Sequence, residues 1–168
     1  ARKSYNVKRI AYVDIDAHHG DGVFYEFLPD PVLFIADIHE DGHYLYPGTG
    51  FRNETGEGEA KGTKLNIPLK PYATDDHFID AFKEVEQFID AARPELIILQ
   101  CGADGLKGDP IAHLQYSPAA HGHAASILHK LAHAHCEGRM IALGGGGYNR
   151  QNIGDAWVEV VKAMAEEV

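Results

Sequence analysis

Cysteine is scarce in this chain of 168 residues, and its two cysteines cannot form a disulfide framework. Cys101 lies in a run of apolar residues, where a cysteine usually contributes to packing rather than to reactivity. A protein without a disulfide framework is typical of a reducing compartment. We therefore expect a cytoplasmic protein.

Basic residues are also few, because 15 Lys and Arg stand against 25 Asp and Glu, which gives a formal net charge of -10. This balance argues against direct binding to nucleic acid, whose phosphates require a basic surface. No apolar run reaches about eighteen residues, so we expect no membrane span. The first residues show neither a signal-peptide pattern nor an initiator Met, and a core strand follows almost at once. The sequence begins as though it were cut from a longer one.

Five short runs rich in Ile, Leu and Val predict strands that are buried on both faces, as in a parallel sheet. These runs cover residues 9–13, 32–38, 64–69, 96–101 and 140–143. Apolar periodicity and helix-start signals predict helices over residues 22–27, 75–92, 118–136 and 153–165. The alternation predicts a three-layer α/β fold, with a mostly parallel sheet and helices on both faces.

The most informative segment runs from Asp14 to Gly22, directly after the first predicted strand, and holds three carboxylates and two imidazoles within eight residues. In an extended segment, alternate side chains share a face, so Asp14, Asp16 and His18 can converge on one point. So much negative charge is costly unless a cation neutralises it, and these oxygen and nitrogen ligands suit zinc. The alternative is a polar turn in which an aspartate caps the next helix. We favour the metal site.

Two later strands also end in candidate residues. Asp104 follows the fourth predicted strand, and four glycines followed by Tyr148 come after the fifth. Four glycines let the backbone approach a ligand closely, although they lack the spacing of a phosphate-binding loop. Residues 40–62 show no sustained period and predict a long loop at the carboxyl end of a strand, where α/β sheets place their ligands.

Taken in order, these motifs resemble the zinc-dependent histone deacetylases, and most closely the bacterial acetoin-utilisation-type members. The motifs are Asp-x-Asp-x-His-His-x-Asp-Gly, Tyr-Pro-Gly-Thr-Gly, Gly-Ala-Asp, Gly-Asp-Pro and Gly-Gly-Gly-Gly-Tyr. The resemblance extends from about Arg9 to Met164. It implies an arginase/deacetylase-like fold and hydrolysis of the acetyl amide of acetyl-lysine, or alternatively of an acetylated polyamine.

The resemblance also implies a role for individual residues. Asp16, His18 and Asp104 would be the ligands of Zn²⁺ or of Fe²⁺, and Tyr148 would donate its hydroxyl to the substrate carbonyl. Further positions follow in the same way: Asp14 and Asp21 orient catalytic histidines, whereas Tyr46, Gly146 and Ile111 contact the substrate.

A structural monovalent cation such as K⁺ is implied near Asp14, His18 and Asp37. Family members often have Ser where this chain has Asp37, and the added carboxylate either tightens the cation or forms a local salt bridge. Other histidines are expected to be structural. His39 is interpreted as a support, and solvated helix faces are expected for His121, His123, His129, His133 and His135.

One part of the family pattern is missing from this sequence. The family's general base belongs to a His-His pair upstream of the first strand; here His18 is taken as a ligand and His19 should point away. We therefore interpret residues 1–168 as the carboxyl-terminal portion of one deacetylase domain, inactive alone, or else as a non-catalytic metal-binding fragment. A truncated sheet should expose apolar surface, so we expect self-association or association with the missing amino-terminal half.

Overall fold

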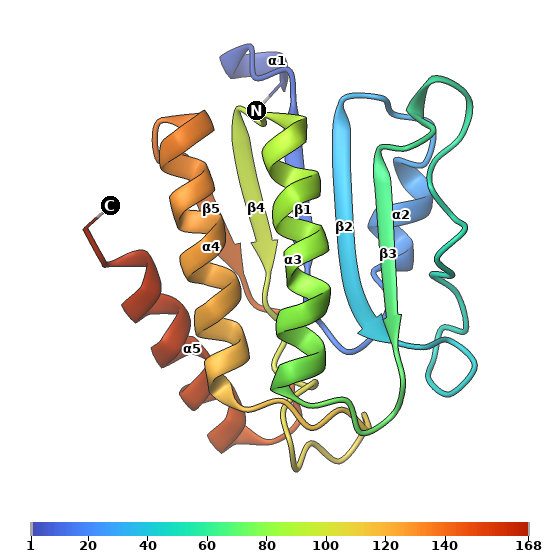
Figure 1. The fold of residues 1–168 in the computed structure, drawn as a ribbon, viewed down its shortest axis with the longest axis vertical. Helices are drawn as coiled ribbons and strands as arrows, with labels where there is room; N and C mark the ends of the chain where they lie inside the picture. Colours follow the sequence, from blue (N-terminus) through green and yellow to red (C-terminus); the bar gives the residue numbers. More distant parts are fainter. Residues whose placement is uncertain (1, 168) are drawn as a thin grey trace.

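The five apolar runs form one parallel sheet in the computed structural model, which describes residues 2–167 (Figure 1). The sheet has the order β3-β2-β1-β4-β5. Its strands are β1 (Ile10–Asp14), β2 (Leu33–Glu40), β3 (Lys64–Leu69), β4 (Leu96–Gln100) and β5 (Met140–Leu143). Because every pairing is parallel, all five carboxyl ends lie at the same edge of the sheet. The sequence prediction is confirmed for each strand, with ends that differ by at most two residues.

The helices also lie close to their predicted positions. They are α1 (Arg2–Tyr5), α2 (Asp21–Glu26), α3 (Asp75–Ala92), α4 (Pro118–Cys136) and α5 (Arg150–Met164), together with the 3-10 turn η1 (Gly58–Ala60). The short helix α1 was not predicted. Helix α5 begins earlier than its apolar periodicity indicated, because the Asn149 side chain accepts a hydrogen bond from the Gln151 amide at 3.0 Å and caps the helix.

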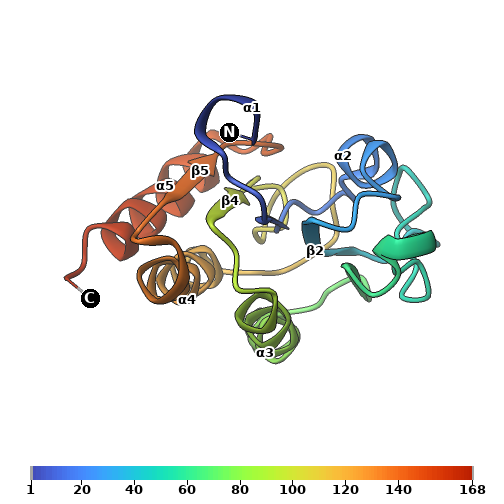
Figure 2. The same cartoon turned by 90° about the horizontal axis from the view of Figure 1, so that it is seen from above.

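The helices are distributed unequally over the two faces of the sheet. Helices α3 and α4 cover one face, and α5 packs against α4, whereas α2 lies on the opposite face (Figure 2). The main core fills the space between the sheet and α3 and α4, with Val13, Phe82, Val85 and Leu99 fully buried. A smaller apolar cluster joins Phe24 of α2 to β2. The parallel α/β fold with helices on both faces is thus confirmed.

The expectation that every strand is buried on both faces is wrong most clearly for β1, β4 and β5. In β1 and β4, alternate residues are only partly buried, and in β5 partly buried residues alternate with exposed ones; the less buried residues of the three strands share one face of the sheet. Tyr12, Ile98 and Ile141 lie side by side there by strand register, and Ile141 and Leu143 are each 47% exposed. The reason is that α2 is short and reaches only the β1–β2 side of this face.

A buried lysine joins the beginnings of β2 and β3. The Lys64 side chain is almost fully buried, and its ammonium donates to the Leu33 carbonyl at 2.7 Å, the Asp30 carbonyl at 3.0 Å and Thr63 Oγ1 at 2.8 Å. A buried ammonium is tolerated only when oxygen atoms surround it in this way.

None of the helices in the described part of the chain has the length and apolar character of a membrane span.

Candidate metal centre

The chain bends immediately after β1, and this bend brings the first candidate residues into position. Asp14 Oδ1 accepts the Asp16 amide at 3.0 Å, and Asp16 Oδ1 accepts the His18 amide at 2.9 Å. These local side chain–backbone hydrogen bonds replace the extended conformation that we assumed. The predicted convergence therefore holds for Asp16 and His18 but not for Asp14, whose carboxylate is occupied by the Asp16 amide and by the Tyr12 hydroxyl at 3.0 Å.

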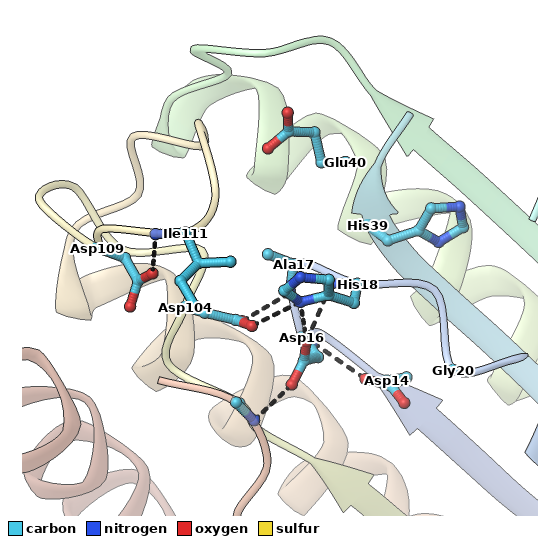
Figure 3. Close-up of polar contacts among 12 residues, drawn as sticks. Asp14, Asp16, Ala17, His18, Gly20, His39, Glu40, Asp104, Asp109 and Ile111 are labelled. Atoms are coloured by element: carbon cyan, nitrogen blue, oxygen red, sulfur yellow. Dashed lines mark hydrogen bonds and ion pairs between the residues drawn. The ribbon is translucent and has the colours of Figure 1, made fainter. Parts of the chain in front are cut away.

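Asp16, His18 and Asp104 form a three-residue cluster at the carboxyl edge of the sheet. Each offers one ligand atom, and these atoms all lie within 4.8 Å of one another. His18 Nδ1 is 2.8 Å from Asp104 Oδ2 and 3.2 Å from Asp16 Oδ1 (Figure 3). Both carboxylates are buried, whereas the His18 side chain is 22% exposed. The cluster therefore has the composition and spacing of a metal site that is open on one side.

Neighbouring donors fix the orientation of the two carboxylates. Asp16 Oδ2 accepts the Gly146 amide at 2.7 Å and the Gln100 side-chain amide at 3.0 Å. Asp104 Oδ1 accepts the Ala17 amide at 2.8 Å, which ties the loop after β4 to the bend after β1 (Figure 3). One oxygen of each carboxylate is thus held by the protein, and the other is directed at His18. Supporting contacts of this kind tune and orient metal ligands.

Two glycines leave room for these carboxylates. A Cβ atom at Gly102 would lie 2.0 Å from Asp16 Oδ2, and one at Gly146 would lie 2.2 Å from Asp104 Oδ2. Any other residue at either position would push a carboxylate aside. This gives a physical reason for glycine at the end of β4 and in the loop after β5.

The three groups strongly influence one another's protonation. Hydrogen bonds to Asp104 and then to Asp16 raise the pKa of His18 to about 10, against the effect of burial. Burial raises the pKa of Asp104, and the charge of Asp16 adds to that shift. Burial opposes ionisation of Asp16, but hydrogen bonds from His18 and Gln100 outweigh it and hold the pKa of Asp16 well below its usual range. His18 thus retains a proton at neutral pH that a bound cation would displace.

A pocket of about 280 Å³ opens over the cluster. It is lined by Asp16, His18, Tyr46, Asp104, Gly146 and Tyr148. The two tyrosines come from the loops after β2 and β5, and their side chains are 78% and 56% exposed, respectively. Ile111, in the loop after β4, does not line this pocket and is 46% exposed. The structure thus brings six of the nine candidate residues together in one pocket, and leaves Ile111 outside it.

The remaining candidates surround the cluster. Asp21 is the first residue of α2 and is half-buried. Asp37 Oδ1 is 2.7 Å from His39 Nδ1, and its Oδ2 accepts the Gly20 amide at 2.9 Å, so its carboxylate forms the local pair that we considered. Burial, followed by the charge of Asp37, raises the pKa of Asp14 well above its usual range.

Two of the histidines for which a solvated face was predicted are buried, whereas His133 is exposed as predicted. His19 points away as expected, with Nδ1 2.9 Å from Thr49 Oγ1. His39 is a structural support, fully buried and bonded to the Gly50 carbonyl at 2.9 Å. The solvated face predicted for His121 and His129 is wrong, because both are buried. His121 lies 2.8 Å from the Gly102 carbonyl, and His129 contacts the Ala163 carbonyl of α5.

Two supporting contacts were missed by sequence reasoning. Gln100 links Asp16 to the backbone: its side-chain nitrogen donates to Asp16, and its side-chain oxygen accepts a hydrogen bond from the Gly102 amide at 2.6 Å. A polar residue at the end of an otherwise apolar strand was the available signal. Glu40 is buried and binds His113 through both the ring, at 2.7 Å, and the backbone amide, at 2.8 Å. No local sequence pattern links these two residues, which lie 73 positions apart.

The fold and the cluster define a parallel α/β protein with a candidate metal site at the carboxyl edge of its sheet. Comparison with known proteins identifies the family of the chain. The model of the histone deacetylase domain family matches residues 1–164, and the chain belongs to this family. It is 41% identical over 165 residues to the acetoin utilization protein AcuC of Bacillus subtilis, and 35% identical over 167 residues to that of Staphylococcus xylosus.

Solved structures share the same fold. The chain is similar to the histone deacetylase Clr3, with a TM-score of 0.91 and 31% identity over 97% of this chain and 28% of that one. The fold also matches an acetylpolyamine aminohydrolase from Burkholderia pseudomallei, with a TM-score of 0.84 and 22% identity over 94% of this chain and 45% of that one. The matches to the AcuC proteins cover 98% of this chain but only 41% and 43% of the relatives. The chain thus spans less than half the length of the curated relatives it matches.

Proposed function

We propose that this chain forms the metal-binding part of a zinc-dependent deacetylase that removes acetyl groups from acetyl-lysine. The observation that carries the proposal is the convergence of Asp16, His18 and Asp104 beneath a pocket that Tyr148 also lines. Residues from the ends of three strands meet there, which is the usual ligand position in a parallel α/β sheet. Membership of the histone deacetylase domain family supports the same activity.

The donor set suits zinc. Two carboxylates and one imidazole balance the charge of a divalent cation and leave coordination positions for water and substrate. Fe²⁺ accepts the same ligand types and is the second candidate. When bound, the metal ion would polarise the acetyl carbonyl and acidify a water molecule. Asp16, His18 and Asp104 would hold it, with Gln100 and Ala17 orienting the carboxylates.

The pocket walls supply the remaining interactions with the substrate. The Tyr148 hydroxyl would donate a hydrogen bond to the acetyl oxygen as negative charge builds there, an interaction whose loss costs about 10²–10³ in rate. Tyr46 offers an aromatic surface to the alkyl part of the lysine side chain. Gly146 leaves space beside the cluster, and Ile111 would contact the substrate at the rim of the pocket.

Deacetylation also requires a general base. Among the described residues, His18 is the only histidine that lines the pocket, and it belongs to the ligand cluster. His19 and His39 are buried in contacts of their own. We therefore propose that the chain alone binds metal but turns over substrate negligibly. Asp14 and Asp21 would orient base histidines supplied by another segment, and the exposed face of β1, β4 and β5 would take up that segment or a second copy.

The carboxylates near the pocket favour acetyl-lysine over an acetylated polyamine, the alternative substrate. A polyamine carries several ammonium groups, which require available carboxylates at the mouth of the site. Here Glu40 is bonded to His113, and Asp41 to Lys70 at 2.8 Å. Both carboxylates are thus already paired with basic side chains, which supports acetyl-lysine, whose alkyl chain is uncharged, as the substrate.

Two further proposals concern the surroundings of the site. A monovalent cation such as K⁺ would lie near Asp14, His18 and Asp37, and the pairing of Asp37 with His39 would then form part of its environment. A cytoplasmic location remains a prediction from the sequence, consistent with the two buried free cysteines.

The proposed function can be tested by calorimetric titration of the zinc-loaded chain with an acetyl-lysine peptide. We expect binding that Tyr148→Phe weakens about 2- to 10-fold, the loss of one hydrogen bond to a neutral carbonyl, whereas Tyr5→Phe, a matched change at an exposed tyrosine far from the pocket, has no effect. Acetylspermidine should bind more weakly than the peptide. Equal binding by the Tyr148→Phe variant would contradict the assignment, and turnover well above that variant would contradict the missing base.

A further inference from the structure

Tyr148 follows a glycine whose backbone conformation other residues rarely adopt. Gly147 has φ +137°, a conformation that favours glycine, and it precedes the tyrosine directly. On one side, Gly146 is held by its amide to Asp16 and by its carbonyl, which accepts the Ala103 amide at 2.7 Å. The Tyr148 phenol is mostly exposed, so packing alone cannot fix its direction. Its position therefore depends on what holds the backbone after Gly147.

Asp109 provides that second attachment. Its Oδ2 accepts the Tyr148 amide at 2.8 Å. Its Oδ1 accepts the Ile111 amide at 2.9 Å, the contact that Figure 3 shows. One carboxylate thus joins the loop that carries the candidate oxyanion donor to the loop that carries the rim residue. Both hydrogen bonds have a charged acceptor, which makes them stronger than bonds between neutral groups.

Asp109 is itself held in place by its own loop. Its amide donates to the Leu106 carbonyl at 3.1 Å, and the Lys107 amide donates to the Tyr116 carbonyl at 2.9 Å. Leu106 and Tyr116 are both buried, so this loop is anchored in the core. A second link joins the loops further on, where the Asn152 side chain donates to the Lys107 carbonyl at 3.2 Å. The carboxylate is therefore presented from a rigid base.

We propose that Asp109 is the positioning residue of Tyr148: it holds the tyrosine backbone so that the phenol faces the three-residue cluster, and it couples this position to that of Ile111. The role of the phenol in the reaction rests on the proposed function above. The contact itself does not, because it involves only backbone amides and one carboxylate. Asp109 touches no substrate in this proposal and acts only through Tyr148 and Ile111.

Amide hydrogen exchange tests the contact. In Asp109→Ala, the exchange rate of the Tyr148 amide should rise about tenfold or more, as expected when a hydrogen bond to a charged acceptor is lost. Asp109→Asn keeps one carbonyl oxygen and should give a smaller rise. Asp155→Ala removes a carboxylate of α5 that is bonded to Gln151, and should leave the rate unchanged. An unchanged Tyr148 rate in Asp109→Ala would overturn the proposal.

Cobalt tests the position of the phenol without any turnover. With Co²⁺ as the probe in the cluster, NMR signals of the Tyr148 ring, identified by their loss in Tyr148→Phe, should show paramagnetic shifts. Asp109→Ala should reduce these shifts at unchanged Co²⁺ affinity. Faster exchange with unchanged shifts would mean that another contact directs the phenol, which also overturns the proposal. If the unmodified chain bound no Co²⁺, the proposed function would fail, and the exchange rates would still decide the role of Asp109.

Discussion

Gly146→Ala is the substitution whose effect the geometry defines best. The added Cβ would lie 2.2 Å from Asp104 Oδ2 and 2.9 Å from Asp16 Oδ2, and ordinary contact begins at 3.4 Å. The Asp104 oxygen, or the loop itself, must therefore move by about 1.2 Å, whereas ligand distances in metal sites are fixed to within about 0.2 Å. Since both carboxylates of the cluster are affected, we expect zinc affinity to fall about 10- to 100-fold.

The matched control for this substitution is Gly154→Ala. Gly154 lies in α5 with open space around its Cβ position, and alanine favours helix. Zinc affinity would be measured by competition with a chelator, and folding by circular dichroism. The reasoning predicts that both variants fold and that only Gly146→Ala loses zinc. Equal zinc affinity in the two folded variants would refute it.

Three further changes test the packing and the electrostatics. Lys64→Met removes the buried ammonium from the oxygen atoms of Leu33, Asp30 and Thr63, and should lower the free energy of unfolding by about 2–4 kcal/mol in urea titrations. The control Lys61→Met, at an exposed position, should change the free energy of unfolding little. Equal free energies of unfolding for the two variants would contradict the account. Leu99→Ala opens a cavity in a central strand and should lower the free energy of unfolding by about 2–5 kcal/mol. Ile141→Ala, at a half-exposed position, should lower it by less than about 1 kcal/mol. A larger loss for Ile141→Ala in the same titrations would show that the core is misplaced. The pKa of His18 is raised to about 10, so its proton must leave when zinc binds. Because protonation competes with the metal, zinc affinity should rise with pH between 6 and 8, with proton release detectable by calorimetry in two buffers; an affinity independent of pH would contradict this.

Local patterns were sufficient to predict the elements of the fold. The apolar runs of Ile, Leu and Val located all five strands, because a strand buried in a parallel sheet needs such residues at nearly every position. The same rule misled for β1, β4 and β5, where Ile98, Ile141 and Leu143 are apolar yet not fully covered. A run of apolar residues predicts a strand, but it does not show which other element buries each face of that strand.

The proximity of the three cluster residues was predicted from the sequence, whereas the contacts that support them were not. Asp16, His18 and Asp104 follow strands whose carboxyl ends share one edge, so their proximity follows from the topology. Gln100 and Asp109 hold the site through contacts 84 and 39 positions apart, and no local spacing encodes such distances.

Local hydrogen bonding explains why the sequence rule placed Asp14 in the cluster. The sequence rule assumed an extended chain, whereas the Asp14 carboxylate accepts the amide two residues ahead and bends the backbone toward the site. Side chains that can bond to their own backbone are the ones for which alternation fails first. The correction strengthens the assignment of the cluster, because the bend that removes Asp14 is what directs Asp16 and His18 toward Asp104.

The most direct test of the account is the zinc content of the purified chain, measured by mass spectrometry of metals alongside Asp104→Ala and Asp155→Ala. The account predicts one zinc per chain in the unmodified protein and in Asp155→Ala, and none in Asp104→Ala. The reason is that Asp104 belongs to the three-residue cluster, whereas Asp155 lies in α5 and is bonded to Gln151. Stoichiometric zinc in a folded Asp104→Ala variant would contradict the central claim.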